Sequence, residues 1–456
     1  MASQKTQQKN PLDEIEEYAG YRLLSFEQEG KLLRELEGKL ELNQNEKEKR
    51  KIVERAIGEL FEVSEAQGRK IAGDILGVSE LGGLLGDAEI EDVIINGTRP
   101  IYIYIAGKGM EKTDYAISSA KELDLLAWKL CVISGKKFDN GVKDFRLPTG
   151  ERVNITPSPM GRHITIRKFK TRPMSVIDLI DNGTLDYDLA ALLWIYTEGL
   201  GAKPANMLIG GMPGAGKTTL LNALFSFFPP KERIVAVEDT MELNTELRGN
   251  CARLETSEEL GMKELVKNSL RMRPDRIIVG EVRGEEAKDL LTAMNIGKIC
   301  MGTLHASTPR EMITRLENKP MDVPRDIIPL IDVFLVVKLL SNGKRVLSHV
   351  SETGGMDGKV LLSDLYVYDP KNSKAALHHA SVMFRDKLAE AAGINPMKLM
   401  DEYERRTKVL RMLHKSGART MEEISEFCER YYADPEGETK KLASVVGAGA
   451  GPAARK

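Results

Sequence analysis

The spacing of hydrophobic and polar positions changes several times along the 456-residue chain. From residue 13 to about 75, apolar residues at helical spacing alternate with many charges, which predicts helices with solvated faces. From about residue 81 the apolar positions alternate around the turn dipeptide Asn96-Gly97, which predicts strands and a hairpin. Residues 119–137 fit a helix and residues 145–170 fit strands again. This region is therefore expected to be a compact α+β domain.

A different rhythm begins after residue 188, where short apolar runs alternate with helical patterns. Short strands that are buried on both faces and separated by helices are typical of a mostly parallel sheet wound by helices. A predicted strand pair, at 345–350 and 360–368, follows, with helices to about residue 432. The apolar runs lie at 207–210, 234–237, 277–279, 299–301 and 333–337.

The predicted fold class is therefore α/β, in several successive parts. Residues 1–12 and the small-residue tail are expected to be disordered. The parts are a mostly helical N-terminal segment (1–75), an α+β domain (76–170), a linker that leads into a helix (171–188), a parallel-sheet domain with C-terminal helices (189–435) and the tail (436–456).

Composition narrows the class of protein. The 66 basic and 68 acidic residues nearly cancel, which argues against a protein whose main role is to coat nucleic acid. The apolar stretch 327–340 contains Pro329, Asp332 and Lys338 and is shorter than the roughly 18 residues of a spanning helix, so we interpret it as a buried strand with flanks. The N-terminus shows no apolar signal segment. The four cysteines, too widely spaced for CxxC chemistry and suited to a reducing cytoplasm, are Cys131, Cys251, Cys300 and Cys428.

The most specific motif lies in residues 207–224, where Gly211-x4-Gly216-Lys217-Thr218 matches the pattern GxxxxGK[ST]. In this arrangement glycines let backbone N–H groups turn inward around phosphates, the lysine reaches the β- and γ-phosphates, and the hydroxyl binds Mg²⁺. An apolar run precedes the loop and a helical pattern follows it, which is the order that the chemistry requires and makes a chance match unlikely. The residues predicted to hold the phosphates are Gly211, Pro213, Gly214, Ala215, Gly216, Lys217, Thr218 and Thr219.

Acidic residues follow two other predicted strands. Glu238, Asp239 and Glu242 come just past one strand end, and Glu281 comes just past another. Ligands bind at the carboxyl ends of strands in such sheets, so we expect these acids to lie near the phosphates. One such acid alone would more simply be a surface carboxylate, whereas two groups behind a complete phosphate loop favour catalysis.

A histidine ends the next predicted strand. His305 closes the stretch ICMGTLH, so it is expected at the same edge of the sheet as the acids. A lone histidine is more often a structural hydrogen-bonding group, but this one has a strand-end position beside the phosphate loop. Thr308, Pro309 and Glu311 supply a cap, a first-turn proline and a capping-box acid for the helix that follows.

The order of these motifs resembles the secretion-ATPase superfamily that powers type II and type IV secretion, type IV pili and the archaellum. GGMPGAGKTT, VEDTMEL, IIVGEVRG and MGTLHAS are similar to that family's Walker A loop, Asp box, Walker B strand and His box. The likeness covers roughly residues 80–370, and upstream it is strongest with the archaeal and Tad-like branches. The paired CxxC zinc insert of bacterial type II enzymes is missing, so no zinc is expected. The segment MNIGKIC departs from the family pattern, with Lys298 near the place of a histidine.

The resemblance implies a PAS-like α+β domain followed by a RecA-like P-loop ATPase domain, with ATP and Mg²⁺ as cofactors. It implies that Glu242 polarises the attacking water, that Glu281 binds Mg²⁺ together with Thr218, and that His305 lies near the γ-phosphate. It also implies that arginines of the first domain approach the nucleotide phosphates, although each could equally form a surface ion pair. These arginines are Arg146, Arg152 and Arg167.

The expected protein is a hexameric, cytoplasmic motor ATPase that contacts the membrane peripherally, through a polytopic platform protein. It would assemble or retract a pilus-like filament or drive protein secretion. Two alternatives remain open at this stage. One is a DNA-transfer ATPase, which would call for a basic, aromatic-bearing channel that the sequence does not show, so a nucleic-acid partner is not expected. The other is a nucleotide-sensing scaffold that does not hydrolyse ATP. An assay of phosphate release would distinguish such a scaffold from an ATPase.

Overall fold

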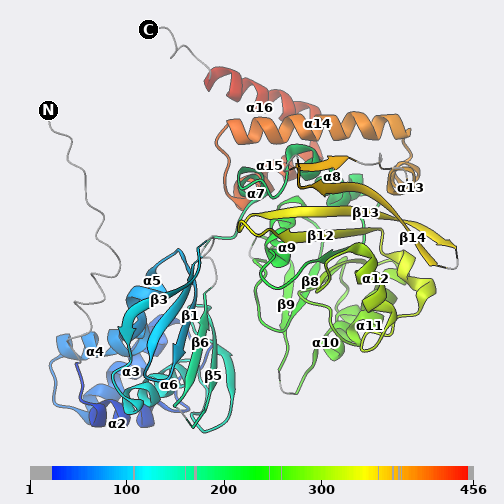
Figure 1. Cartoon of the computed structure of the whole chain (residues 1–456). Coiled ribbons are helices and arrows are strands. Elements are labelled where there is room, and N and C mark those ends of the chain that lie inside the picture. The colour runs from blue at the N-terminus through cyan, green and yellow to red at the C-terminus, as the bar shows by residue number, and fades with distance from the viewer. Residues whose placement is uncertain are drawn as a thin grey trace. The chain divides into compact units, whose positions relative to one another are not determined.

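The computed structural model describes residues 23–449, apart from 106–107, 160, 169–171, 246, 258, 358, 372–373, 378–380 and 382. The expected disorder of residues 1–12 and of the last seven residues of the tail lies outside these ranges. The chain divides into two units, Met1–Thr171 and Arg172–Lys456, and each has its own sheet and its own helices (Figure 1).

The first unit combines helices with one antiparallel sheet in the strand order β3-β2-β1-β6-β5-β4. Its first three described helices each begin with a capping box, in which the side chains of Ser25, Asn45 and Ser64 accept a backbone N–H. The elements are α2 (Phe26–Leu36), α3 (Glu46–Leu60), α4 (Glu65–Gly77), η1 (Ser79–Leu81), α5 (Gly82–Gly86), β1 (Ile90–Asn96), β2 (Pro100–Ile105), β3 (Gly109–Ala116), α6 (Ala120–Ile133), β4 (Lys143–Arg146), β5 (Arg152–Thr156) and β6 (His163–Arg167).

One apolar core joins the helices of this unit to its sheet. Leu33 of α2, Val53 of α3 and Ile71 of α4 belong to the same buried cluster as Val153 of β5 and Ile166 of β6. The N-terminal helices are therefore part of the α+β unit, and the predicted boundary near residue 75 is wrong. Sequence spacing alone missed this because each helix exposes a charged face that resembles a solvated segment.

The start of the predicted strand region also differs. Residues 82–86 form the short helix α5, and the first strand begins only at Ile90. The predicted hairpin is present, since β1 pairs antiparallel with β2 and Gly97 adopts a positive φ of 67° in the turn between them.

The second unit contains a nine-stranded sheet in the order β15-β14-β13-β12-β7-β11-β10-β8-β9. Its elements are α7 (Val176–Asp181), α8 (Tyr187–Glu198), η2 (Gly199–Gly201), β7 (Met207–Gly210), α9 (Lys217–Leu224), η3 (Phe225–Phe227), β8 (Ile234–Glu238), β9 (Cys251–Glu255), α10 (Met262–Ser269), η4 (Leu270–Met272), β10 (Arg276–Val279), α11 (Glu286–Asn295), β11 (Ile299–Leu304), α12 (Pro309–Glu317), η5 (Arg325–Leu330), β12 (Val333–Leu339), β13 (Arg345–Asp357), β14 (Lys359–Asp369), β15 (Lys374–Leu377), α13 (Met383–Ala392), α14 (Pro396–Lys415), α15 (Met421–Ala433) and α16 (Pro435–Gly449).

The neighbouring strands β12, β7, β11, β10, β8 and β9 pair in parallel, which confirms the predicted parallel sheet. The remaining strands, β13 to β15, pair antiparallel, so the sheet as a whole is mixed. The sequence did not predict β9, because its residues CARLE are half-buried and lack a continuous apolar run.

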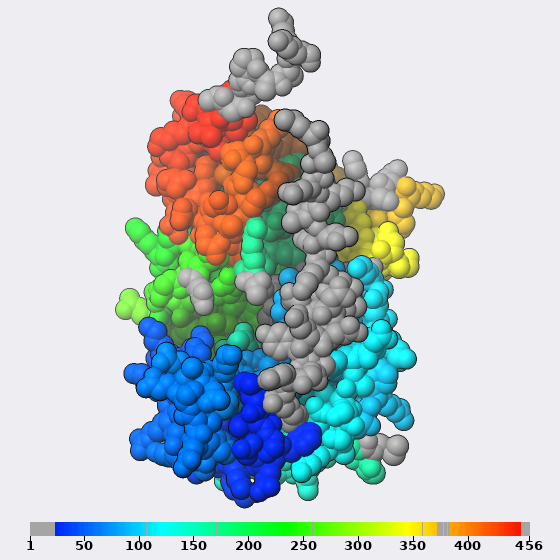
Figure 2. Space-filling model, turned by 90° about the vertical axis from the view of Figure 1, so that its left-hand side faces the viewer, coloured from blue at the N-terminus to red at the C-terminus, as the bar shows by residue number. Residues whose placement is uncertain are grey.

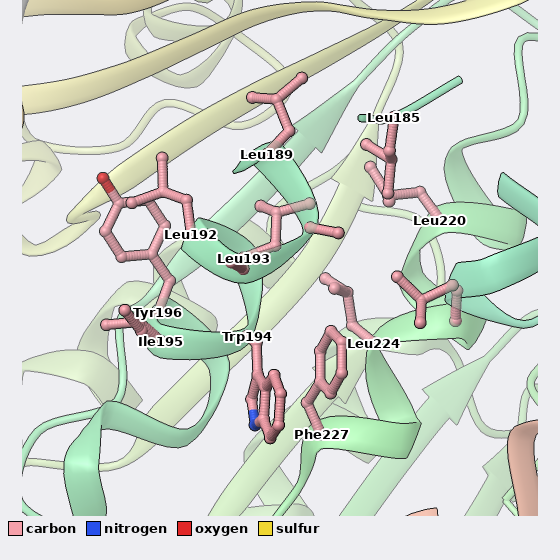
Figure 3. Close-up of a cluster of buried hydrophobic side chains, with 14 of the residues drawn as sticks. Leu185, Leu189, Leu192, Leu193, Trp194, Ile195, Tyr196, Leu220, Leu224 and Phe227 are labelled. Carbon is pink, nitrogen blue, oxygen red and sulfur yellow. The ribbon is translucent and has the colours of Figure 1, made fainter. Parts of the chain in front are cut away.

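Alternate residues of the parallel strands enter two different apolar layers. Met207 and Ile209 of β7 pack with helices α7, α8, α9 and α14 to α16, whereas Leu208 packs with α10 to α12. Figure 1 shows these two groups of helices on opposite sides of the sheet. In the first layer Leu193 and Leu224 lie beside Trp194 and Phe227, whose stacked ring centroids are 5.2 Å apart (Figure 3). Burial on both faces explains why these strands are short and almost wholly apolar.

Two further boundaries need correction. The predicted linker contains α7, which begins with a capping box at Ser175 and buries Val176 and Ile177 completely. The predicted disordered tail contains most of α16, because Leu442 packs into the core and Glu438 pairs with Arg430 of α15 at 3.1 Å. Figure 2 shows these last helices, in orange and red, packed against one another. Small residues such as alanine do not prevent a helix when neighbouring helices cover it.

The apolar stretch near residue 330 forms η5 and the buried strand β12, as predicted. Over the ranges that the structure describes, no helix combines the length and apolar composition that crossing a bilayer requires.

Candidate functional site

The glycine-rich loop lies between β7 and α9, in the strand–loop–helix order expected from the sequence. Gly214 and Gly216 have positive φ angles of 73° and 98°, which side chains rarely adopt. A Cβ atom on Gly211 would lie 2.7 Å from the backbone oxygen of Val337, so this position has no room for a side chain. The loop therefore depends on glycine both for its conformation and for its approach to β12.

The side chain of Lys217 lies inside this loop and is only 8% exposed. Its Nζ donates to the backbone oxygen of Met212 at 3.5 Å and lies 3.2 Å from Nδ1 of His305. Arg345 of β13 donates from Nε to the backbone oxygen of Gly214 at 3.0 Å. Of the other predicted phosphate-binding residues, Ala215 is buried, Pro213 and Gly214 are exposed, and Gly216, Thr218 and Thr219 are half-buried.

The sheet register brings the next two strand ends to this loop. Leu304 of β11 pairs with Gly210 of β7, and Val279 of β10 pairs with Gly302 of β11. His305 and Glu281 follow these strands, and His305 Nε2 lies 2.8 Å from a carboxylate oxygen of Glu281. Lys217, His305 and Glu281 therefore form a continuous chain of polar contacts along one edge of the sheet.

The donors in this chain follow from the chemistry of each group. Nδ1 of His305 lies 3.2 Å from Lys217 Nζ and 3.3 Å from the backbone oxygen of Gly211, while Nε2 faces Glu281. The ammonium of Lys217 can only donate and the oxygen of Gly211 can only accept, so Nδ1 serves one of these two partners at a time. The ammonium group of Lys217 therefore lies between the glycine-rich loop and His305.

The acids after β8 have three different environments. Glu238 is 2% exposed, and burial raises the pKa of its carboxyl to about 7, against a smaller lowering by the backbone N–H groups of Glu242 and Leu243. Asp239 forms an ion pair with Arg283. Glu242 is half-buried, and its carboxylate accepts no hydrogen bond from the residues that the structure describes. Among these three acids, Glu242 is therefore the one whose carboxylate has no hydrogen-bond partner within the described residues.

The three predicted arginines lie side by side on the polar face of the first unit's sheet. The register pairs Arg146 with Arg152 and Arg152 with Arg167, while Arg167 also faces Asp92 of β1. Arg152 donates to both carboxylate oxygens of Asp144, at 3.0 and 2.7 Å. The structure thus gathers these arginines with one another, but they belong to a different unit from the glycine-rich loop.

Three positions around the loop were not singled out by sequence reasoning. Asn222 of α9 contacts the backbone after β8, Arg345 contacts the loop itself, and Arg283 pairs with Asp239. Asn222 reads as an ordinary polar residue in a helix, and the two arginines read as surface charges. Their roles depend on tertiary contacts that no local pattern encodes.

The residues that the structure describes include no group of three or more histidine, cysteine, aspartate or glutamate side chains placed to hold a metal ion. Thr218 and Glu281, the two residues predicted to bind Mg²⁺, follow β7 and β10 at the same sheet edge.

The model of the family described as "Type II/IV secretion system protein" matches residues 139–423. The uncharacterized protein MJ0781 of Methanocaldococcus jannaschii is 44% identical over 227 residues, which are 47% of this chain but only 31% of that protein. The uncharacterized protein MJ1287 of the same organism is 33% identical over 55% of this chain and 96% of its own length. The putative conjugal transfer protein Rv3659c of Mycobacterium tuberculosis is 32% identical over 55% of this chain and 74% of its own length.

The raised pKa of Glu238 predicts a pH-dependent gain in stability for Glu238→Gln. The carboxyl group is protonated in the folded state up to about pH 7, whereas in the unfolded chain it ionises near its ordinary value of 4.5. As pH rises between these values, the free energy of unfolding of the wild-type protein falls by up to about 3 kcal/mol. The reason is that the carboxyl group releases its proton in the unfolded chain but keeps it in the folded state, so rising pH favours unfolding. The glutamine variant lacks this loss.

Urea unfolding of both proteins at pH 5 and pH 8 measures the effect. The free energy of unfolding of Glu238→Gln, relative to wild type, should rise between the two pH values. A difference that stays constant with pH would show that Glu238 is not held in a protonation-sensitive buried site.

Proposed function

Because the chain belongs to the type II/IV secretion system protein family, whose ATPases are P-loop NTPases that hydrolyse ATP, we propose that it is a motor ATPase. It binds ATP in the glycine-rich loop and couples hydrolysis to the assembly or retraction of a type IV pilus-like filament, or to protein secretion. The observation that carries this proposal is the convergence of Lys217, His305 and Glu281 at one edge of the sheet, directly after the glycine-rich loop and two neighbouring strands.

The loop residues supply the phosphate contacts. Backbone N–H groups between Gly211 and Thr219 surround the phosphates, and the amino end of α9 faces the anion. The half-buried hydroxyl of Thr218 and the 30% exposed carboxylate of Glu281 would hold a Mg²⁺ ion, since both offer the oxygen ligands that this ion prefers. When bound, Mg²⁺ neutralises part of the phosphate charge.

Binding of ATP draws Lys217 away from His305, since the triphosphate offers the ammonium group a stronger, charged acceptor. The imidazole is then free to donate to an oxygen of the γ-phosphate, which ADP lacks. Glu242 orients the attacking water, because its half-buried carboxylate accepts no hydrogen bond from the described residues, whereas Glu238 is buried and Asp239 pairs with Arg283.

The row of arginines supports an assembly in which subunits share sites. The register sets these three guanidinium groups side by side, with Asp144 paired to Arg152 and Asp92 opposite Arg167, and a bound anion would add to the compensation of their charges. We assign the first unit as the PAS-like domain and the second as the RecA-like domain of a homo-hexamer, with Arg146, Arg152 and Arg167 approaching nucleotide phosphates. The motor acts in the cytoplasm and docks on a polytopic platform protein at the membrane.

A DNA-transfer ATPase is the second candidate, and the similarity to a putative conjugal transfer protein favours it. It shares the hydrolytic site and differs in what the motor moves. A scaffold without turnover is the third candidate, and the family's ATP-hydrolysing members argue against it.

Lys217→Ala should abolish ATP turnover while the protein stays folded, because Lys217 supplies charge to the phosphates and contributes little to the apolar core. Phosphate release and thermal unfolding measure the two effects. Lys203→Ala, which removes a half-buried lysine before the amino end of β7, is the matched control and should retain turnover. Wild-type rates in Lys217→Ala would rule out the assigned site.

His305→Ala should reduce the preference for ATP over ADP. Loss of a hydrogen bond to a charged phosphate should weaken ATP binding by roughly 10- to 100-fold, with ADP affinity within about threefold of wild type. Titration calorimetry with a non-hydrolysable ATP analogue and with ADP measures both affinities. If the variant lost affinity for both nucleotides equally and melted at a much lower temperature, His305 would have a structural role only.

Sedimentation velocity should show a hexamer that a non-hydrolysable ATP analogue favours. A mixing experiment tests the shared site directly, using Lys217→Ala chains and chains in which Arg146, Arg152 and Arg167 are all alanine. Each variant alone should be nearly inactive. Mixed rings should recover part of the turnover, because an intact loop from one variant meets intact arginines from the other. Full activity of a monomer, or no recovery on mixing, would contradict the shared site.

A further inference from the structure

The side chain of Glu238, at the end of β8, is buried and forms hydrogen bonds with the backbone of the turn that contains Glu242. One carboxylate oxygen accepts the N–H of Glu242 at 2.8 Å and the N–H of Leu243 at 2.9 Å. Gly280 at the end of β10 leaves the space for this side chain, since a Cβ there would lie 3.0 Å from Glu238 Cγ. With 2% of its surface exposed, Glu238 cannot reach a nucleotide or its attacking water.

The same turn is held from the helix that follows the phosphate loop. Asn222 of α9 donates from Nδ2 to the backbone oxygen of Glu242 at 3.2 Å and accepts the N–H of Asn244 at 2.7 Å. Arg253 of β9 donates to the backbone oxygen of Leu243 at 2.8 Å. Side chains from α9, β8 and β9 therefore fix the backbone of three consecutive residues.

These contacts involve only the backbone of Glu242, whose carboxylate accepts no hydrogen bond over the described part of the chain. Asn222 lies five residues after Lys217 on the same helix, so this network of contacts also sets the place of Glu242 relative to the phosphate-binding end of α9.

We propose that Glu238 and Asn222 are positioning residues for hydrolysis, which hold Glu242 at a fixed place relative to the phosphate loop. The inference rests on the proposed function, because it assigns these residues to the hydrolytic step. Neither residue touches the nucleotide. Both act through the Glu242 backbone, and misplacement of a water-orienting group by about 1 Å can cost on the order of 100-fold in rate.

The test compares variants that keep or remove the acceptor at position 238. Glu238→Gln retains an oxygen for the two N–H groups, so its kcat should stay within about threefold of wild type. Glu238→Ala leaves both N–H groups without this acceptor, and its kcat should fall by at least about tenfold. Nucleotide affinity should change by less than about threefold in both variants, because the phosphate loop is intact.

Asn222→Asp provides a second variant at the other end of the network. The aspartate keeps the acceptor for Asn244 but replaces the donor to the Glu242 backbone by an oxygen, which repels the carbonyl. Its kcat should also fall by at least about tenfold, with nucleotide affinity preserved. If Glu238→Ala fails to fold, Asn222→Asp decides the proposal, since wild-type turnover in that variant would overturn it.

A matched control separates positioning from general loss of stability. Glu232 lies just before β8, at the opposite end of that strand, and pairs with the fully buried Arg276 at 2.7 Å. Glu232→Gln should lower the melting temperature and leave kcat at 25 °C near the wild-type value. If Glu232→Gln and Glu238→Ala lost kcat in proportion to their loss of melting temperature, Glu238 would be a structural residue and the proposal would fail.

A double variant shows whether Glu238 acts through Glu242. On a Glu242→Gln background, Glu238→Ala should produce little further loss of kcat, because the group it positions is already gone. Full additivity of the two losses would overturn the proposal. Normal turnover in Glu242→Gln alone would instead show that the assigned role of Glu242 is wrong, which is a failure of the proposed function rather than of the network.

Discussion

The parallel register of β7, β11 and β10 is the constraint on which the candidate site depends. It sets Gly210 beside Leu304 and Val279 beside Gly302, so that the residues just after these strands meet at one edge. Side chains alternate between the two faces of a sheet, so a slip of one residue in the pairing of β11 would turn His305 away from its contacts with Lys217 and Glu281. Two bonds beyond the ladder reinforce this register, from Thr303 Oγ1 to the oxygen of Gly280 and from the N–H of Val282 to the oxygen of Thr303.

The apolar layers on both faces keep that register rigid. Ile278 and Met301 pack into the layer with α8 and α9, while Ile277 and Cys300 pack into the layer with α10 and α11. The site itself is built from polar contacts, and within the described residues the carboxylate of Glu242 takes part in none of them. In open α/β folds the sheet commonly provides a rigid scaffold, and ligands bind to residues on the loops at the carboxyl ends of its strands.

Much of the second unit could be predicted from sequence, because its strands are continuous apolar runs and its phosphate loop has a pattern with a chemical meaning. The positions of Glu281 and His305 could be predicted for the same reason, as both directly follow such runs. The hydrogen bonds that Glu238 and Asn222 make with the backbone around Glu242 could not be predicted. Three acids follow the strand, and nothing in the local sequence shows which of them is buried. The alignment of the three arginines also needed the antiparallel register of β4, β5 and β6. The helices α7 and α16 were missed because they are short or rich in small residues and are stabilised by tertiary packing.

The central claim is that Lys217, His305, Glu281 and Glu242 form one hydrolytic site around a triphosphate. A structure with a non-hydrolysable ATP analogue and Mg²⁺ tests it most directly, through the distance from Lys217 Nζ to His305 Nδ1, which is 3.2 Å in the structure described above. The account predicts that this distance lengthens beyond hydrogen-bond range as Lys217 moves to the β- and γ-phosphates, with His305 turned to the γ-phosphate and Glu242 facing the water behind it. An analogue bound while Lys217 remains on His305, or with Glu242 turned away from the γ-phosphate, would contradict it.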